Sequence, residues 1–300
     1  MKAGTPTMGG LAIVAGVSCG YVLSDLVGGI YTLRGIFVML AILGGATVGL
    51  IDDWIKVAAA RNLGLSKRAK MLGLLVVAVG FAFLMTEFTE ISTTLSFTRA
   101  DHPGLEMGRV LWMLWAVLLV AATTNGVNLA DGLDGLAAGA GALGFAAFTF
   151  IGFWQFRHES VYINPAALDL AVISAAMVGA IIGFLWWNAA PAQIFMGDTG
   201  SLAIGSGLAA LALATSTQLL LPIIGGLFVV ETLSVILQVI VFKRFGGRRL
   251  FRMAPIHHHF ELLGWPETTI IIRFWIMTGI CTAVGLGLFY ADAINAGFTA

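Results

Sequence analysis

Long uninterrupted runs of hydrophobic residues alternate with short polar segments along the whole chain. Each run is about as long as the roughly 20 helical residues that cross a hydrocarbon core about 30 Å thick. The apolar residues are continuous, which favours helices over the alternating strands of a closed barrel. Hydropathy predicts nine spans, at about 8–28, 35–51, 71–87, 109–124, 136–154, 168–187, 200–216, 219–242 and 270–291. The pattern therefore predicts an all-α, polytopic transmembrane bundle that forms one domain over residues 1–300.

Composition agrees with this class. The chain is 59% hydrophobic and 11% charged, whereas a soluble domain averages about 25% charged residues. The formal net charge is zero, so there is no global field to attract nucleic acid, and we expect no such partner. Cys19 and Cys281 both lie inside apolar runs and are expected to be small packing residues, not a disulfide or a metal site.

The charges predict the orientation. With nine spans, the polar segments 1–7, 52–70, 125–135, 188–199 and 243–269 lie on one side. With Arg273 at their border, they hold twelve of the sixteen Lys and Arg residues. The positive-inside rule makes this side and the N-terminus cytoplasmic. We expect no signal peptide, because Met1 leads directly into the polar start of the chain. On the outer side, the alternation from Ile91 to Phe97 predicts a short hairpin.

The second predicted span ends in two carboxylates, Asp52 and Asp53, followed by Lys56. A charged Asp costs about 2.5–3.5 kcal/mol at the centre of a membrane helix, so a position at a span end is expected. Successive helical residues point about 100° apart, which predicts that one carboxylate binds an ion or removes a proton while the other orients. A solvated span end neutralised by Lys56 is the alternative.

A second polar segment places Asn125, Asn128, Asp131 and Asp134 at intervals of three residues, interrupted by glycines. Neighbours at this spacing share a helical face. The glycines predict a bend with exposed backbone N–H groups, suited to a phosphate or a nucleobase. An ordinary polar turn is the alternative, but it accounts poorly for so many carboxamides and carboxylates.

A third segment runs from Asn188 to Ser201, where Asp198 stands between glycines. Mg²⁺ prefers one or two carboxylates together with water and substrate phosphates. Asp198 is therefore the main candidate for a metal ligand, with Asp52 or Asp53 as the second. Alternatively, Asp198 caps the helix that begins near Ser201.

The last large polar loop combines arginines with three consecutive histidines, His257, His258 and His259. The histidines cannot share one helical face, and their spacing does not bring together enough ligands for tetrahedral zinc. Phosphate recognition is favoured, because histidine also exchanges a proton near neutral pH. A basic loop that holds anionic lipid headgroups is the alternative.

One carboxylate lies inside a predicted span. Glu231, Ser234 and Gln238 fall on one face at helical spacing. Such a polar stripe is more typical of interhelical hydrogen bonding than of catalysis.

Five segments together resemble the polyprenyl-phosphate N-acetylhexosamine 1-phosphate transferase superfamily. They are Lys2–Gly10, Gly49–Asp53, Asn125–Gly135, Phe195–Ser201 and Met253–Glu261. The last of them, Met-Ala-Pro-Ile-His-His-His-Phe-Glu, points to the phospho-N-acetylmuramoyl-pentapeptide branch. The resemblance covers essentially the whole chain.

The resemblance implies Mg²⁺-dependent transfer of phospho-N-acetylmuramoyl-pentapeptide from UDP-MurNAc-pentapeptide to undecaprenyl phosphate, which releases UMP and forms lipid I for peptidoglycan synthesis. It implies a homodimer in the bacterial cytoplasmic membrane, with the active site on the cytoplasmic face. The family has ten helices, of which the ninth is broken beside a lipid groove. Because this chain shows nine spans and opens at the Lys2 motif, we expect the family's first span to be missing from it.

The resemblance also assigns roles by position. Asp198 would bind Mg²⁺, Asp52 and Asp53 would handle the lipid phosphate, and His257 is a further catalytic candidate. Around the uridine, the resemblance implies Phe195, Gly132, Leu133 and Asp134, with Lys2 nearby. Around the diphosphate and sugar, it implies Lys56, Lys67, Asn125, Asn128, Asp131, Asn188, His258 and His259, together with His257. Thr7 is a further expected substrate-binding residue.

Two anionic substrates need charge neutralisation and positioning more than covalent help. Direct attack by the lipid phosphate is our hypothesis, with Asp52 or Asp53 as base or orienting group. A double displacement through an aspartyl-linked phosphosugar is the rival.

Two other functions remain open. A sister transferase for GlcNAc 1-phosphate would keep the metal and uridine residues but should not need the His-rich loop. A membrane transporter should hold its polar groups near mid-membrane, between repeated halves.

Overall fold

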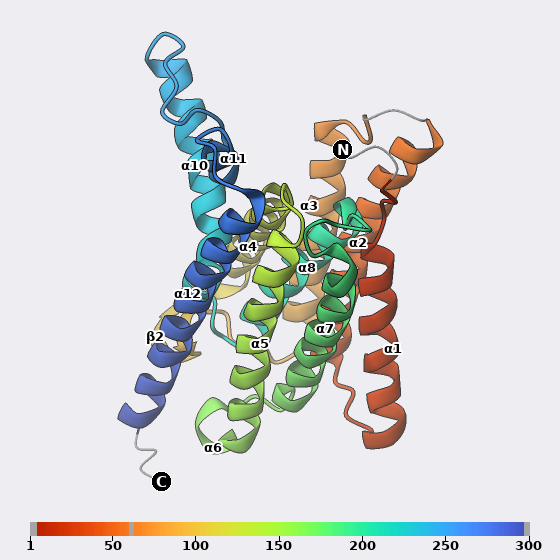
Figure 1. Cartoon of the computed structure of the whole chain (residues 1–300). Helices are drawn as coiled ribbons and strands as arrows, with labels where there is room; N and C mark the ends of the chain where they lie inside the picture. The colour runs from red at the N-terminus through yellow and green to blue at the C-terminus, as the bar shows by residue number, and fades with distance from the viewer. Residues whose placement is uncertain (1–4, 60–62, 297–300) are drawn as a thin grey trace.

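The chain folds into a bundle of membrane-length helices with one small hairpin (Figure 1). A computed structural model describes residues 5–59 and 63–296. Within these residues, eight helices are long and apolar enough to cross a membrane, which confirms the all-α, multi-pass class. They are α1 (Gly10–Gly28), α2 (Leu33–Ala58), α3 (Lys67–Phe88), α4 (Gly108–Ala130), α5 (Leu136–Arg157), α7 (Ala167–Asn188), α10 (Gly226–Arg244) and α12 (Glu267–Asn295).

The seventh predicted span, 200–216, corresponds to α8 (Gly197–Ala214), which is not among these eight. Its polar first turn, which contains Asp198 and Thr199, lowers the mean hydropathy of a helix of only 18 residues. The helix is buried from Thr199 to Ala214. The span predicted at 219–242 is interrupted at Gly225, between the short α9 (Leu221–Ile224) and α10.

α8 occupies the middle of the bundle, packed against α2, α4 and α1 (Figure 1). A Cβ atom added at Gly205 of α8 would collide with the backbone of α4 at Thr124. A Cβ atom at Gly49 of α2 would collide with the backbone of Asp198. Helices in lipid associate largely through close backbone approach, so these glycines determine how tightly α8 is held.

The chain before α1 joins the start of α8. The amide of Gly9 donates to the carbonyl of Phe195 at 2.8 Å, and the amide of Phe195 donates to the carbonyl of Pro6 at 2.9 Å. A Cβ atom at Gly10 would collide with the backbone of Gly200. Two glycine-containing motifs that are far apart in the sequence therefore lie side by side.

The bundle has two chemically different ends (Figure 1). The site end carries the start of α1, the end of α2, the turn 131–135, the segment 189–196 and α11 (Ile256–Glu261). The hairpin end carries α6 (Glu159–Tyr162) and the hairpin. The strands β1 (Thr94–Arg99) and β2 (His102–Glu106) pair antiparallel, so the predicted hairpin is confirmed.

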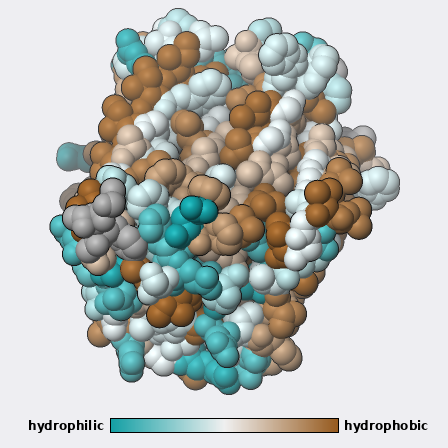
Figure 2. Space-filling view, turned by 90° about the horizontal axis from the view of Figure 1, so that it is seen from below, coloured by the Kyte–Doolittle hydropathy of each residue, from teal (hydrophilic) through white to brown (hydrophobic). Residues whose placement is uncertain are grey.

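The hairpin is tied to its neighbours by polar contacts. Thr98 donates from its hydroxyl to Asp292 of α12 at 2.6 Å, and Arg99 Nε lies 3.0 Å from the same carboxylate. Gln218, after α8, donates to the carbonyl of Thr94 at 3.2 Å. Figure 2 shows this end from below, with hydrophilic residues gathered on one part of a surface that is otherwise largely apolar. Both cysteines are free: Cys281 is half-buried on α12, whereas Cys19 is exposed on α1 and so does not pack in the interior as predicted.

We expect Gly205→Ala to destabilise the bundle, because the new methyl group would push α8 away from α4. Overpacking of this kind costs about 1–3 kcal/mol. The control is Gly183→Ala on the exposed face of α7, where an added Cβ meets nothing within 4 Å. That variant should change stability by at most about 1 kcal/mol. Thermal unfolding in detergent measures both, and equal midpoints would contradict this account of the packing.

Candidate active site at the ends of α2 and α8

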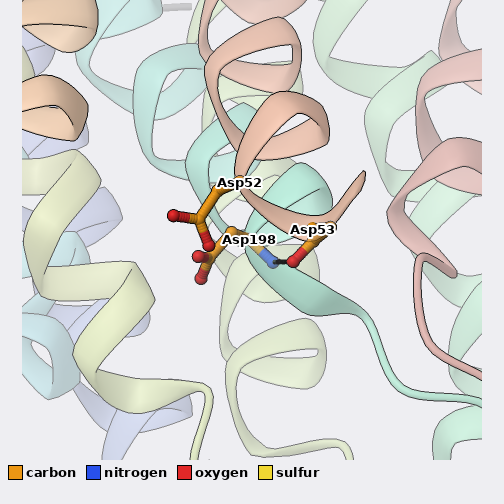
Figure 3. Close-up of side chains that lie close together, drawn as sticks. All are labelled: Asp52, Asp53 and Asp198. Atoms are coloured by element: carbon orange, nitrogen blue, oxygen red, sulfur yellow. Dashed lines mark hydrogen bonds between the residues drawn. The ribbon is translucent and has the colours of Figure 1, made fainter. Parts of the chain in front are cut away.

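Three carboxylates meet at the site end of the bundle. Asp52 and Asp53 lie in the last turns of α2, and Asp198 lies in the first turn of α8 (Figure 3). One oxygen from each lies within 4.8 Å of the others. Asp52 and Asp53 are buried, and Asp198 is half-buried. The structure thus brings together the three candidates for metal ligands, while their binding of an ion stays a prediction.

A positive charge stands where the three carboxylates meet. Lys56, one turn after Asp52, places Nζ 2.5 Å from Asp52 Oδ2, 2.9 Å from Asp198 Oδ2 and 3.4 Å from Asp53 Oδ1. Like charges this close repel strongly when water is partly excluded, so the cluster requires a cation. The ammonium group stands in for that cation here.

Asp53 and Asp52 have different environments. Asp53 accepts hydrogen bonds from the amides of Asp198 (3.2 Å) and Thr199 (2.9 Å) and from the Thr199 hydroxyl (2.8 Å). The first of these bonds is drawn in Figure 3. The first N–H groups of a helix lack intrahelical partners and carry partial positive charge, so Asp53 caps α8. Asp52 instead accepts from the amide of Leu65 at 2.8 Å and pairs with Lys56.

A second lysine completes the cluster, and the sequence reasoning missed it. Lys70 Nζ lies 2.5 Å from Asp198 Oδ2 and 3.9 Å from Asp52 Oδ1. Lys67, which was singled out, is exposed at the start of α3. The basic residues of this segment are too closely spaced for the sequence to show which one points inward. That depends on how α3 packs on α2.

A cavity of about 630 Å³ opens beside the cluster. Its lining combines charged side chains with Gly132, Leu133 and one aromatic residue, Phe195. The predicted site residues that line it are Thr7, Asp53, Lys56, Asn128, Asp131, Gly132, Leu133, Asp134, Asn188, Phe195 and Asp198.

The predicted bend in the Asn–Asp segment begins later than the spacing suggested. α4 continues to Ala130, so Asn128 is helical, and its amide donates to Asp198 Oδ1 at 2.7 Å. The turn 131–135 follows, and Asp134 accepts from the amide of Ala192 at 2.9 Å. Burial, together with the charges of Asp198 and Asp53, raises the pKa of Asp131 to about 7.

Several predicted residues do not line the cavity. The Asn125 amide donates to the carbonyl of Ala121 within its own helix at 2.7 Å. His258 pairs with Glu261 at 2.5 Å, and His259 accepts from the amide of Arg252 at 3.1 Å. Asp52, Lys67 and His257 are also absent from the lining, and Lys2 lies outside the described residues.

His257 lies behind the cavity wall. Its side chain is fully buried, and a Cβ atom added at Gly132 would collide with its Nε2. Two acidic residues that were not predicted, Glu261 and Glu267, line the cavity. Glu267 accepts from the amide of Asp134 at 3.1 Å. Neither stands in a spacing pattern that would have revealed it.

Comparison with known proteins agrees with the motifs. The sequence model of glycosyl transferase family 4 matches residues 35–216. The phospho-N-acetylmuramoyl-pentapeptide-transferase signature 1 matches residues 2–14, the segment that joins α1 to α8.

Full-length relatives carry the same name. A phospho-N-acetylmuramoyl-pentapeptide-transferase of Streptomyces avermitilis is 49% identical over 97% of this chain and 85% of its own length. The transferase of Frankia casuarinae is 49% identical over 99% of this chain and 87% of its own length. That of Rhodococcus jostii is 50% identical over 98% of this chain and 87% of its own length. The resemblance seen in the five motifs is thereby confirmed, and the chain belongs to the family of phospho-N-acetylmuramoyl-pentapeptide-transferases.

Proposed function

We propose that the chain transfers phospho-N-acetylmuramoyl-pentapeptide from UDP-MurNAc-pentapeptide to undecaprenyl phosphate, releasing UMP and forming lipid I. The observation that carries this proposal is the convergence of three carboxylates and two lysines at one edge of a cavity large enough for a nucleotide-sized group. Transfer between two anionic substrates is catalysed mainly by positioning and positive charge.

Mg²⁺ fits the donor set at the cluster. Asp52, Asp53 and Asp198 offer hard carboxylate oxygens within 4.8 Å of one another, and the Lys56 ammonium already lies at the point where they meet. We infer that these residues hold the ion, which when bound would supply Lewis-acid neutralisation of phosphate oxygens. Lys56 and Lys70 contribute further positive charge from the protein itself.

The donor nucleotide is proposed to occupy the opposite side of the cavity. Phe195 offers an aromatic face on which a uracil ring can stack. Gly132, Leu133 and Asp134 would complete the uridine pocket, because the turn they form lines the same cavity as Phe195. The bond between Asp134 and Ala192 ties this turn to the segment that carries Phe195.

The lipid chain of the acceptor is proposed to lie against α10. An apolar cavity of about 200 Å³ opens between α4 and the broken α9–α10 pair, with Gly126, Pro222 and Phe228 in its wall. An isoprenoid chain has matching chemistry, since it offers only apolar surface. The break at Gly225 is consistent with the broken ninth span that the sequence resemblance implies.

The geometry supports direct attack by the lipid phosphate. Its oxygen would form a new bond to the sugar-linked phosphorus of the donor while the bond from that phosphorus to the UMP oxygen breaks, so UMP leaves as an oxyanion. Asp53 is a poor nucleophile for the rival double displacement, because both its oxygens already accept hydrogen bonds at the start of α8. Asp52, beside Lys56 and Lys70, is better placed to orient the acceptor.

The chain is a multi-pass membrane protein, and we infer that its site end faces the cytoplasm of a bacterial inner membrane. The Lys and Arg residues concentrated in the site-end segments support this orientation. UDP-linked donors are soluble, so a cytoplasmic site also gives the donor direct access. The homodimer stays a prediction.

Asp198→Asn should abolish most of the metal-dependent activity. Purified protein in detergent receives UDP-MurNAc-pentapeptide, undecaprenyl phosphate and Mg²⁺, and UMP release is measured. We expect a loss of about 100-fold or more in the variant, and a similar loss when EDTA replaces Mg²⁺ in the wild type. Wild-type release that persists in EDTA would argue against the proposed metal dependence.

Lys70→Ala should reduce UMP release by about 10- to 100-fold, because it removes a partly buried charge-assisted contact with Asp198. The matched control is Lys67→Ala, one turn earlier on the same helix but exposed. Its rate should stay within about twofold of the wild type. Equal losses in both variants would show that the lysines act only through the general charge of the surface.

Direct attack predicts that Asp53 never becomes covalently modified. Protein incubated with UDP-MurNAc-pentapeptide and Mg²⁺, but without undecaprenyl phosphate, should release no UMP and retain its unmodified mass. Intact-protein mass spectrometry provides the measurement. A phosphosugar adduct that peptide mapping places on Asp53 would establish the double displacement instead.

A further inference from the structure

We propose that Glu231 is a positioning residue that holds His257 against the donor-binding turn 131–135. The proposal rests on the proposed transferase function and adds a second layer to its site. α10 and α11, which carry the two residues, lie side by side at the site end (Figure 1).

The two side chains form a pair shielded from solvent. Glu231 Oε1 lies 3.0 Å from His257 Nδ1, and both side chains are fully buried. Among the described residues, no hydrogen bond is formed by either oxygen of Glu231 or by either ring nitrogen of His257, so this close contact is what pairs the two buried groups. A carboxylate in a membrane span is expensive unless it is paired, so the contact with His257 accounts for the presence of Glu231.

The opposite edge of the imidazole reaches the cavity wall. A Cβ atom at Gly132 would collide with His257 Nε2, so the ring lies directly against the turn. Gly132, together with its neighbours Asp131 and Leu133, lines the cavity. A carboxylate this close to Nδ1 favours a proton on that nitrogen and restricts the orientation of the ring, which keeps the Nε2 edge against the turn.

The rest of the polar stripe on α10 anchors the same loop. Gln238 Oε1 accepts from the amides of Leu250 (3.1 Å) and Phe251 (2.9 Å), and Gln238 Nε2 donates to the carbonyl of Phe251 at 3.2 Å. Gln238 thus holds the loop before α11, and Glu231 holds α11 itself. Among the described residues, the hydrogen bonds between helices that were predicted for this stripe are not formed: Gln238 bonds to the loop and Ser234 bonds within α10, while Glu231 contacts α11 only through its pairing with His257.

The contacts join into one path from the membrane interior to the donor side of the site. Glu231 lies on α10, His257 on α11, and Gly132 on the turn after α4. α10 also packs on α4, where Gly126 allows close approach to Thr232 and Phe228. A carboxylate on a rigid helix can therefore set the position of the turn without contacting substrate.

The test compares Glu231→Gln with Ser234→Ala by steady-state kinetics of UMP release. Ser234 lies on the same face, but its hydroxyl donates back to the carbonyl of Glu231 at 2.7 Å and leaves the His257 contact untouched. We expect Glu231→Gln to raise the KM for UDP-MurNAc-pentapeptide by about tenfold. The KM for undecaprenyl phosphate should stay within about twofold, and Ser234→Ala should match the wild type in both constants.

A double-mutant cycle tests whether Glu231 acts through His257. Once His257→Gln is present, adding Glu231→Gln should change the donor KM by less than about twofold. Multiplicative effects in the double variant would overturn the proposal. So would an unchanged donor KM in Glu231→Gln, or an equal rise in both KM values.

Two controls separate the possible failures. Absence of UMP release by the wild type with both substrates and Mg²⁺ would refute the proposed function, whereas an active wild type with an unaltered Glu231→Gln would refute only the positioning role. Thermal unfolding checks that each variant is folded. If Glu231→Gln is not folded, Glu231→Asp replaces it. The shorter side chain keeps the charge but withdraws the carboxylate from His257 by one methylene. We expect the same rise in the donor KM for this variant.

Discussion

The cap that Asp53 places on the start of α8 is the interaction on which the rest of the site depends. It fixes the first turn of α8 against the end of α2, and the closeness allowed by Gly49 then puts Asp198 beside Asp52. Three carboxylates so close would repel one another strongly, and the lysines at positions 56 and 70 offset that repulsion. The charged groups of the cluster therefore depend on one another, because removing one charge leaves the others buried without compensation.

The membrane explains where this chemistry lies. Backbone and charged groups in hydrocarbon must find partners within the protein, so polar side chains are concentrated at helix ends, where water and soluble substrates can reach them. A transporter would need such groups near mid-membrane, between repeated halves. Among the described residues, the in-span carboxylate of Glu231 is paired with His257. It lines neither the cavity beside the carboxylate cluster nor the apolar cavity against α10. The arrangement thus favours a transferase that works at one membrane surface.

Much of the fold and part of the site could be predicted, because both follow from local patterns. Continuous apolar runs located the spans, and carboxylates at span ends on one side pointed to Asp52, Asp53 and Asp198. Tertiary packing decided the rest. Which of Lys67 and Lys70 reaches the cluster depends on the rotation of α3, and the cavity position of Glu267 depends on how the start of α12 meets the turn. The different hydrogen-bonding partners of Asp52 and Asp53 likewise depend on the position of α8 beside α2, which local patterns do not reveal.

The pairing of Glu231 with His257 shows why a carboxylate is useful inside a span despite its cost. The loop before α11 is long and lies at the surface, where backbone alone would leave a histidine poorly placed. Anchors on a helix are more precise than anchors on a loop, since neighbouring side chains restrict their rotamers. Gln238 and Glu231 lie about two turns apart on α10, so together they fix both the path of the loop and the ring at its end. The polar stripe thus connects a rigid membrane helix, through His257, to the turn 131–135 at the cavity.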